Sequence, residues 1–157
     1  MVVRVAVLLL TALSILSGRY ATAQRQPTSC GRIEIRSDEL SAGEADRYCR
    51  YAESEADKVH KFWGDTWNET IRIHVSSSYR ISRALVPAFQ GNRGFLEMPL
   101  RRARGNDGAL LHEIVHIYAP GSNRFLAEGV AVYLHDKLAG NPALRGSRMV
   151  LPEFELA

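Results

Sequence analysis

The residues best able to do chemistry lie in one short stretch, ALLHEIVHIYAP, from Ala109 to Pro120. His112, Glu113 and His116 follow the pattern H-E-x-x-H. Residues four apart on a helix lie nearly above one another, so the two imidazoles can direct nitrogens at one point, as two zinc ligands do. Glu113 lies about 100° around the helix from His112, where its carboxylate can reach a zinc-bound water without being a ligand. The pattern predicts a zinc site with Glu113 as general base.

The alternative is that two histidines happen to lie four apart on a buried helix. Between Asp107 and Tyr118, apolar residues occupy nearly every position outside the H-E-x-x-H residues. This pattern predicts a helix that is buried around most of its circumference. Two imidazoles and a carboxylate on such a helix cost desolvation free energy unless they are paired, hydrogen-bonded or bound to a metal. One metal ion would satisfy all three groups, which favours the zinc site.

A catalytic zinc ion also needs a third protein ligand and leaves its fourth position to water. Glu128 is the acidic residue in the apolar part of the next predicted helix, within FLAEGVAVYL. The connection between the helices, Ala119 to Asn123, is short enough to fold the second helix back, so that Glu128 can face the histidines. His135 is the alternative third ligand. It lies roughly 10 Å further along the helix, and we expect it to be exposed near the helix end.

The two segments HEIVH and FLAEGVAVYL together resemble the zinc metallopeptidases of the gluzincin type, most closely the peptidase MA-like domains of exported bacterial proteins. The resemblance implies a zincin-like fold, with Zn²⁺ bound by His112, His116 and Glu128. It also implies hydrolysis of peptide bonds through a zinc-bound water that Glu113 activates. Two alternatives stay open: a non-catalytic domain that keeps the zinc site for structure or binding, and an interaction module without metal.

The resemblance also implies a place for a peptide or protein substrate. Such enzymes lay an extended substrate along an edge strand, and GFLEMPL, from Gly94 to Leu100, is expected to be that strand because Pro99 favours a sheet edge.

The source of oxyanion stabilisation departs from the family. Gluzincins take a tyrosine or histidine from downstream of the glutamate helix, and this sequence has neither after His135. Either the residue that stabilises the oxyanion is of an unusual type, with Asn123 and Arg124 as candidates, or the chain is a fragment that lacks a C-terminal helical part. Tyr118 and Tyr133 are expected to be packing residues.

The elements that must position these residues are predicted from periodicity. Residues 31–37 and 70–75 alternate apolar and polar residues as half-buried strands do. Residues 41–64 predict a helix with a Ser41/Glu44 capping box, Gly64 as terminator and an apolar stripe that includes Cys49. His60 lies off that stripe, and His74 on the strand face opposite the apolar residues. The order of elements predicts one α+β domain with a small, mostly antiparallel sheet packed on helices.

The N-terminus predicts export. Residues 1–23 combine Arg4, an apolar run too short to span a membrane, and the triplet Ala21-Thr22-Ala23, which is typical of a cleaved signal peptide. The mature domain would cover residues 24–157, with no membrane span and a periplasmic or extracellular location. In that oxidising compartment Cys30 and Cys49 are expected to form a disulfide rather than stay as buried thiols.

The charge of the mature chain argues against a nucleic-acid partner. Removing Arg4 and Arg19 takes two of the 20 basic residues away, which leaves 18 against 17 acidic residues. The remaining basic cluster, Arg101 to Arg104, is expected to lie in a solvated loop, because a nucleic-acid interface needs a broader basic face.

Overall fold

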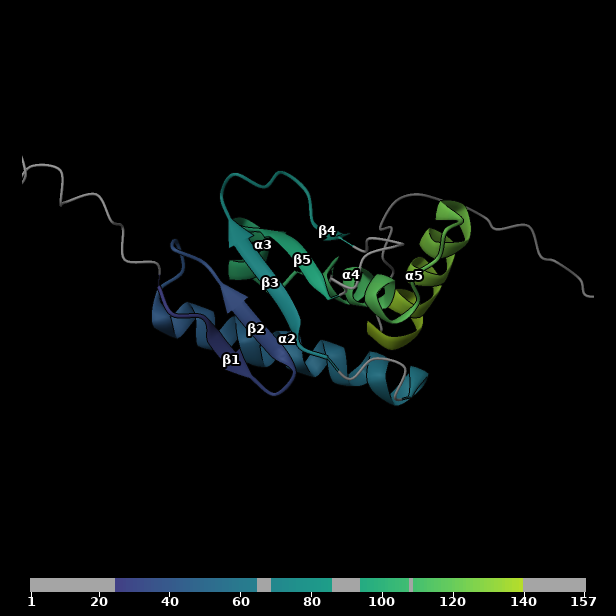
Figure 1. Ribbon diagram of the computed structural model, residues 1–157, viewed down its shortest axis with the longest axis horizontal. Helices are drawn as coiled ribbons and strands as arrows, with labels where there is room; N and C mark the ends of the chain where they lie inside the picture. Colours follow the sequence, from purple (N-terminus) through teal and green to yellow (C-terminus); the bar gives the residue numbers. More distant parts are fainter. Residues whose placement is uncertain (1–24, 65–68, 86–93, 108, 140–157) are drawn as a thin grey trace, which may run out of the picture.

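The computed structural model describes residues 25–64, 69–85, 94–107 and 109–139 (Figure 1). The elements in chain order are β1 (Thr28–Cys30), β2 (Ile33–Arg36), α2 (Ala42–Trp63), β3 (Ile71–Ser76), β4 (Arg83–Leu85), β5 (Phe95–Pro99), α3 (Leu100–Gly105), α4 (Ala109–Tyr118) and α5 (Arg124–Ala139). The expected signal peptide, residues 1–23, lies outside the described residues. In the part of the chain that is described, no helix is both long and apolar enough to cross a membrane.

The five strands form one mixed sheet in the order β1-β2-β3-β5-β4. β1 pairs with β2 and β4 with β5 in antiparallel fashion, whereas β2 with β3 and β3 with β5 are parallel. The fold is therefore α+β, but the expectation of a mostly antiparallel sheet is wrong. The reason lies in α2, which follows β2 and returns the chain to the end of the sheet where β2 began, so β3 runs parallel to β2.

The expected edge strand lies inside the sheet. Gly94 to Leu100 does contain a strand, β5, but β5 is paired with β3 on one side and with β4 on the other. Pro99 is tolerated there because it is the last residue of β5, where its missing N–H affects only the end of the ladder. β4 is the edge strand on that side of the sheet.

Helix α2 begins and ends as predicted. The Ser41 hydroxyl accepts a hydrogen bond from the Glu44 N–H at 3.2 Å, and the Glu44 carboxylate accepts one from the Ser41 N–H at 2.8 Å. Gly64 closes the helix with a φ of 76°, a conformation that favours glycine. Cys49, on the buried stripe, forms the expected disulfide with Cys30, with the two Cα atoms 6.0 Å apart. The bond ties the β1 end of the sheet to α2.

One face of the sheet packs on helices, and the other is open. The inward side chains of the strands are buried: Ile33, Ile35, Ile71, Ile73, Val75, Leu96 and Met98. Helices α2 and α4 cover this face, and α5 packs against both of them (Figure 1). Leu110, Leu111, Ile114 and Ile117 of α4 have no exposed surface. α4 is thus held rigidly in the core, and replacing one of these leucines by alanine typically costs about 2–5 kcal/mol.

Candidate metal centre

Helix α4 presents its few polar residues along the part of its surface that borders a cavity. Its first residue, Ala109, donates its N–H to the Asp107 carboxylate at 3.2 Å, which satisfies an unpaired N–H at the helix start. His112 and His116 are half-buried on one face, with 19% and 15% of their side chains exposed. Because α4 is packed on its other faces, both imidazoles are held in place by the core.

Helix α5 brings the third residue to the same point. Asn123 precedes α5, and its side-chain oxygen accepts the N–H of Leu126 at 3.2 Å, so this asparagine caps the helix. The short connection folds α5 back along α4, and the two helices are in extensive contact. Glu128, one turn into α5, then faces His112 and His116. The sequence expectation that these three side chains converge is met by this arrangement.

The three ligand atoms are separated as a small metal ion requires. His112 Nε2 lies 3.2 Å from His116 Nε2 and 3.1 Å from Glu128 Oε2, and His116 Nε2 lies 3.6 Å from the same oxygen. Ligand atoms at about 2.0–2.1 Å from a tetrahedrally coordinated zinc ion lie about 3.3 Å apart. In the described ranges these three residues form the one group of His, Cys, Asp and Glu side chains that could hold a metal ion.

The electrostatics of the histidines favour metal binding. Burial lowers the pKa of His112, with a further lowering by His116, and it also lowers the pKa of His116. The Glu128 carboxylate opposes both shifts without reversing them. Both imidazoles are therefore neutral at pH 7, which is the form that binds a metal. Two nitrogens and one carboxylate oxygen are also a donor set that zinc accepts, although the residues alone do not identify the metal.

Glu113 points into the same cavity from the neighbouring position on α4. Its side chain is buried, and its Oε2 accepts the backbone N–H of Ala84 on β4 at 2.8 Å. Burial raises the pKa of Glu113, while hydrogen bonds from Ser82 and Ala84 partly offset that rise. The carboxylate does not belong to the group of metal-ligand atoms. The Glu113 carboxylate thus lies beside the candidate metal position. It is carried by α4 and held in place by a hydrogen bond from β4.

Residues that the sequence could not indicate complete this setting. The Arg102 guanidinium on α3 donates to the Ser82 hydroxyl at 2.8 Å, and Ser82 in turn bonds Glu113. No local motif marks Ser82, Ala84 or Arg102, because their relation to Glu113 arises from pairing of β4 with β5 and from the placement of α3. The short stretch I-S-R-A-L, residues 81–85, mixes apolar and polar residues, and it is the one local pattern that could have suggested a short strand here.

The cavity around these side chains has a volume of about 480 Å³. Its lining comes from β4, the residues before it, α4, α5 and the connection between these two helices: Ile81, Ser82, Arg83, Ala84, His112, Glu113, His116, Pro120, Gly121, Arg124, Ala127 and Glu128. Among the candidate oxyanion helpers, Arg124 lines the cavity and Asn123 does not. Tyr118 is buried and Tyr133 is largely exposed, and neither contributes to the lining.

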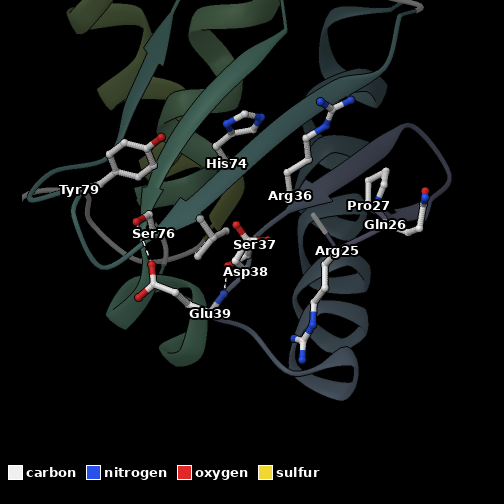
Figure 2. A pocket seen from close by; sticks show the side chains of 11 residues that line it. Arg25, Gln26, Pro27, Arg36, Ser37, Asp38, Glu39, His74, Ser76 and Tyr79 are labelled. Carbon is white, nitrogen blue, oxygen red and sulfur yellow. Dashed lines mark hydrogen bonds between the residues drawn. The ribbon is translucent and has the colours of Figure 1, made fainter. Parts of the chain in front are cut away.

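The other histidines lie apart from the group. His135 is buried, with 5% of its surface exposed, so the expectation of an exposed position is wrong: it lies near Glu55 of α2 and Asp107 and is not a member of the metal-binding group. His60 is half-buried and its ring lies 6.3 Å from that of Tyr118. His74 lies on the open face of the sheet, as expected, beside a second cavity (Figure 2).

The histidine and glutamate group thus combines the geometry and the donor chemistry of a site that could hold a metal ion, with half-buried histidines and a Glu128 side chain that is 47% exposed. The resemblance to zinc metallopeptidases rests on the sequence segments alone. Comparison of the chain with protein-family models, with curated proteins and with solved structures finds no match.

Proposed function

We propose that this protein is an exported, zinc-dependent hydrolase that cleaves peptide bonds, with His112, His116 and Glu128 as zinc ligands and Glu113 as general base. One observation carries the proposal: three ligand atoms from two helices lie 3.1–3.6 Å apart, close to the spacing around a tetrahedral zinc ion. The neighbouring carboxylate and the resemblance of the two helical segments to gluzincins support the catalytic part. The Cys30–Cys49 disulfide is consistent with export.

When bound, zinc supplies a Lewis acid that polarises a carbonyl and makes a water molecule more acidic. The residues of the chain supply the rest. His112 and His116 are held neutral by burial, ready to act as ligands. Glu113 takes a proton from water in the cavity, and its raised pKa brings the carboxylate closer to the range in which a general base both accepts and returns a proton. The Ala84 N–H keeps that carboxylate directed at the cavity.

The substrate strand in this proposal is added to β4 rather than to β5. β4 is the outer strand on the β5 side of the sheet, and the Ala84 N–H points away from β5 toward Glu113. A peptide in extended conformation along that edge would therefore pass beside Glu113 and the metal-binding group. Pairing of a peptide with an open strand edge is a general mode of recognition.

A second candidate function is zinc binding without catalysis. The observation that favours it is the lining of the cavity, in which the described residues include no tyrosine and no histidine besides the two ligands. Arg124 is the one residue of the lining, within the described part, whose charge is free to stabilise an oxyanion, because Arg83 is paired with Glu97.

The test is to measure zinc content and hydrolysis together. We expect the mature protein to bind one zinc ion and to cleave members of a quenched-fluorescence peptide library. Glu113→Gln should keep the zinc and lose hydrolysis by about 10²–10⁴-fold, because the amide cannot accept the proton. Glu69→Gln is the matched control, since Glu69 is exposed and lies outside the cavity.

Each other result has a definite meaning. Loss of zinc in Glu113→Gln would make Glu113 a ligand or a structural partner rather than the base. Zinc binding in the parent with no cleavage of any library member would leave the non-catalytic function. A protein that binds no zinc would contradict both candidates.

A further inference from the structure

A third cavity, of about 490 Å³, lies between the turn that follows β3 and helix α3. Its side chains include Tyr79 and Arg80 from the turn, and Leu100, Arg101 and Arg104 from α3. The arginine cluster that the sequence assigns to a solvated loop is thus part of a helix, and two of its members line a concave surface. In the described part of the chain, the lining contains three arginines and no carboxylate.

Two of these guanidinium groups have no partner among the residues that the structure describes. Arg80 and Arg101 are exposed and make neither an ion pair nor a hydrogen bond with any described residue. Arg104 donates its Nε to the Glu44 carboxylate at 2.9 Å. Most described arginines elsewhere pair with a carboxylate, as Arg102 and Arg83 do with Asp107 and Glu97. The positive charge of this cavity is therefore not balanced by its own lining.

The neighbouring cavity on the open face of the sheet differs in this respect. It is lined by Arg25, Arg36 and His74, but also by Asp38 and Glu39, so opposite charges lie within the same lining (Figure 2). Arg36 is moreover bound to Glu34 at 2.6 Å. In that cavity, positive and negative side chains offset one another. The cavity lined by Arg80, Arg101 and Arg104 has no negative side chain of its own among the described residues, so its positive charge is available to an anion from outside.

We propose that the cavity formed by Tyr79, Arg80, Leu100, Arg101 and Arg104 is a binding site for a small molecule that carries a phosphate or carboxylate group. Guanidinium groups bind both anions through paired, charge-assisted hydrogen bonds. Leu100, Pro99 and the Tyr79 ring provide an apolar surface on which the body of such a molecule can lie. This site is separate from the candidate metal centre and does not depend on its chemistry.

The site shares structural elements with the cavity at the candidate metal centre, which is called the metal cavity below. Arg80 is followed by Ile81 and Ser82, which line the metal cavity, and Arg101 is followed by Arg102, which donates to Ser82. A bound anion that contacts Arg80 and Arg101 therefore joins the two segments that position Ser82.

The experiment is an NMR titration of the ¹⁵N-labelled mature protein, without added metal, with phenyl phosphate and with inorganic phosphate. Amide shifts are expected in residues 77–80 and 100–104, and phenyl phosphate should bind more tightly because of its apolar ring. Arg80→Gln with Arg101→Gln should raise Kd by at least about tenfold, since each substitution removes charge-assisted hydrogen bonds to the anion. Benzoate should displace phenyl phosphate if the site accepts carboxylates, and its failure to do so would restrict the site to phosphates.

Arg72→Gln is the matched control, because Arg72 is another exposed arginine with no side-chain partner in the described part of the chain, on β3 and outside this cavity. Its Kd should equal that of the parent, and the double lysine variant should retain part of the affinity. An unchanged Kd in the double glutamine variant, or shifts confined to residues 112–116 at the metal centre, would overturn the proposal. Dispersed spectra of each variant report that it is folded.

Discussion

The metal cavity and the cavity beside His74 carry the same kinds of residues in different arrangements. Each is lined by histidine, arginine and carboxylate side chains, and their volumes are about 480 and 410 Å³. On the open face of the sheet, Arg36, His74, Glu97 and Arg83 lie in one row of the register, and each arginine is paired with a carboxylate, Arg36 with Glu34 and Arg83 with Glu97. In the metal cavity, by contrast, two imidazole nitrogens and a carboxylate oxygen converge.

This difference separates polar surfaces from candidate metal sites. A cross-strand row satisfies its own charges, so it needs no additional group. Three ligand atoms directed at one point leave lone pairs together, and a cation is the group that satisfies them. Convergence of ligand atoms, rather than a histidine in a cavity, is therefore the feature that distinguishes the metal cavity.

The largest expected effect compares His116→Ala with His74→Ala. Loss of a residue that hydrogen-bonds a zinc ligand already costs about 10–100-fold in affinity, so loss of a ligand should cost more than about 100-fold. His74→Ala should leave the affinity unchanged, because His74 lies outside the metal-binding group. Competition with a chromogenic chelator measures both constants. Equal effects of the two substitutions would mean that the two regions do not differ in the way their geometry indicates.

The next effect concerns the end of the molecule that carries the disulfide. Cys30 and Cys49 are 19 positions apart, and the chain-entropy relation for a loop of this size gives a stabilisation of about 3 kcal/mol. Replacing both cysteines by serine should lower the free energy of unfolding by that amount in a urea titration. Zinc affinity should stay the same, since neither cysteine belongs to the metal-binding group or lines its cavity. A parallel loss of zinc would show that the site depends on that end of the fold.

Local pattern was sufficient for much of the fold and for the members of the metal-binding group. The capping box of α2, its buried stripe and the strand at residues 71–76 follow from signals within a few residues. His112, His116 and Glu128 could be brought together because helical spacing and a short connection fix their positions. These predictions need no knowledge of distant contacts.

Features that depend on distant contacts were not predicted. The edge position of β4 and the interior position of β5 arise from pairing between residues that a long connection separates. Ser82 and Arg102 reach Glu113 across three different elements. His135 is buried although it lies near the end of α5, because α2 covers that side of the helix. Helical periodicity predicts which residues share a face of one helix, but it does not predict which other elements cover that face.

A smaller effect is expected from Ser82→Ala, compared with Ser76→Ala on the open face. Ser82 lowers the pKa of Glu113 through its hydrogen bond, so its loss should raise that pKa further and move the acidic limb of the activity profile to higher pH. A hydrogen bond to a charged carboxylate is worth about 1.5–3 kcal/mol, which corresponds to a shift of about one to two pH units. Ser76 bonds Glu39, which lies outside the metal cavity, so Ser76→Ala should not shift the profile. If the pH profile moved in neither variant, Ser82 would not influence the pKa of the catalytic base.

The smallest effect is on stability without metal. Burial lowers the pKa values of His74 and His112 alike, so both imidazoles bind protons more weakly in the folded state than in the unfolded state. Their contribution to stability is present above the unfolded pKa of about 6.5 and is lost as pH falls toward the lowered folded pKa. His74→Gln and His112→Gln should each flatten the fall in the free energy of unfolding between pH 7 and pH 5.5, measured in urea.

Added zinc should then separate the two variants. In His74→Gln the stabilisation by zinc stays intact and weakens with acid, because protons compete with the metal for neutral imidazoles. In His112→Gln most of that stabilisation is absent at every pH. If zinc instead stabilised both variants equally, burial alone would account for the shifted pKa of His112, and the metal cavity would have to be classed with the open face.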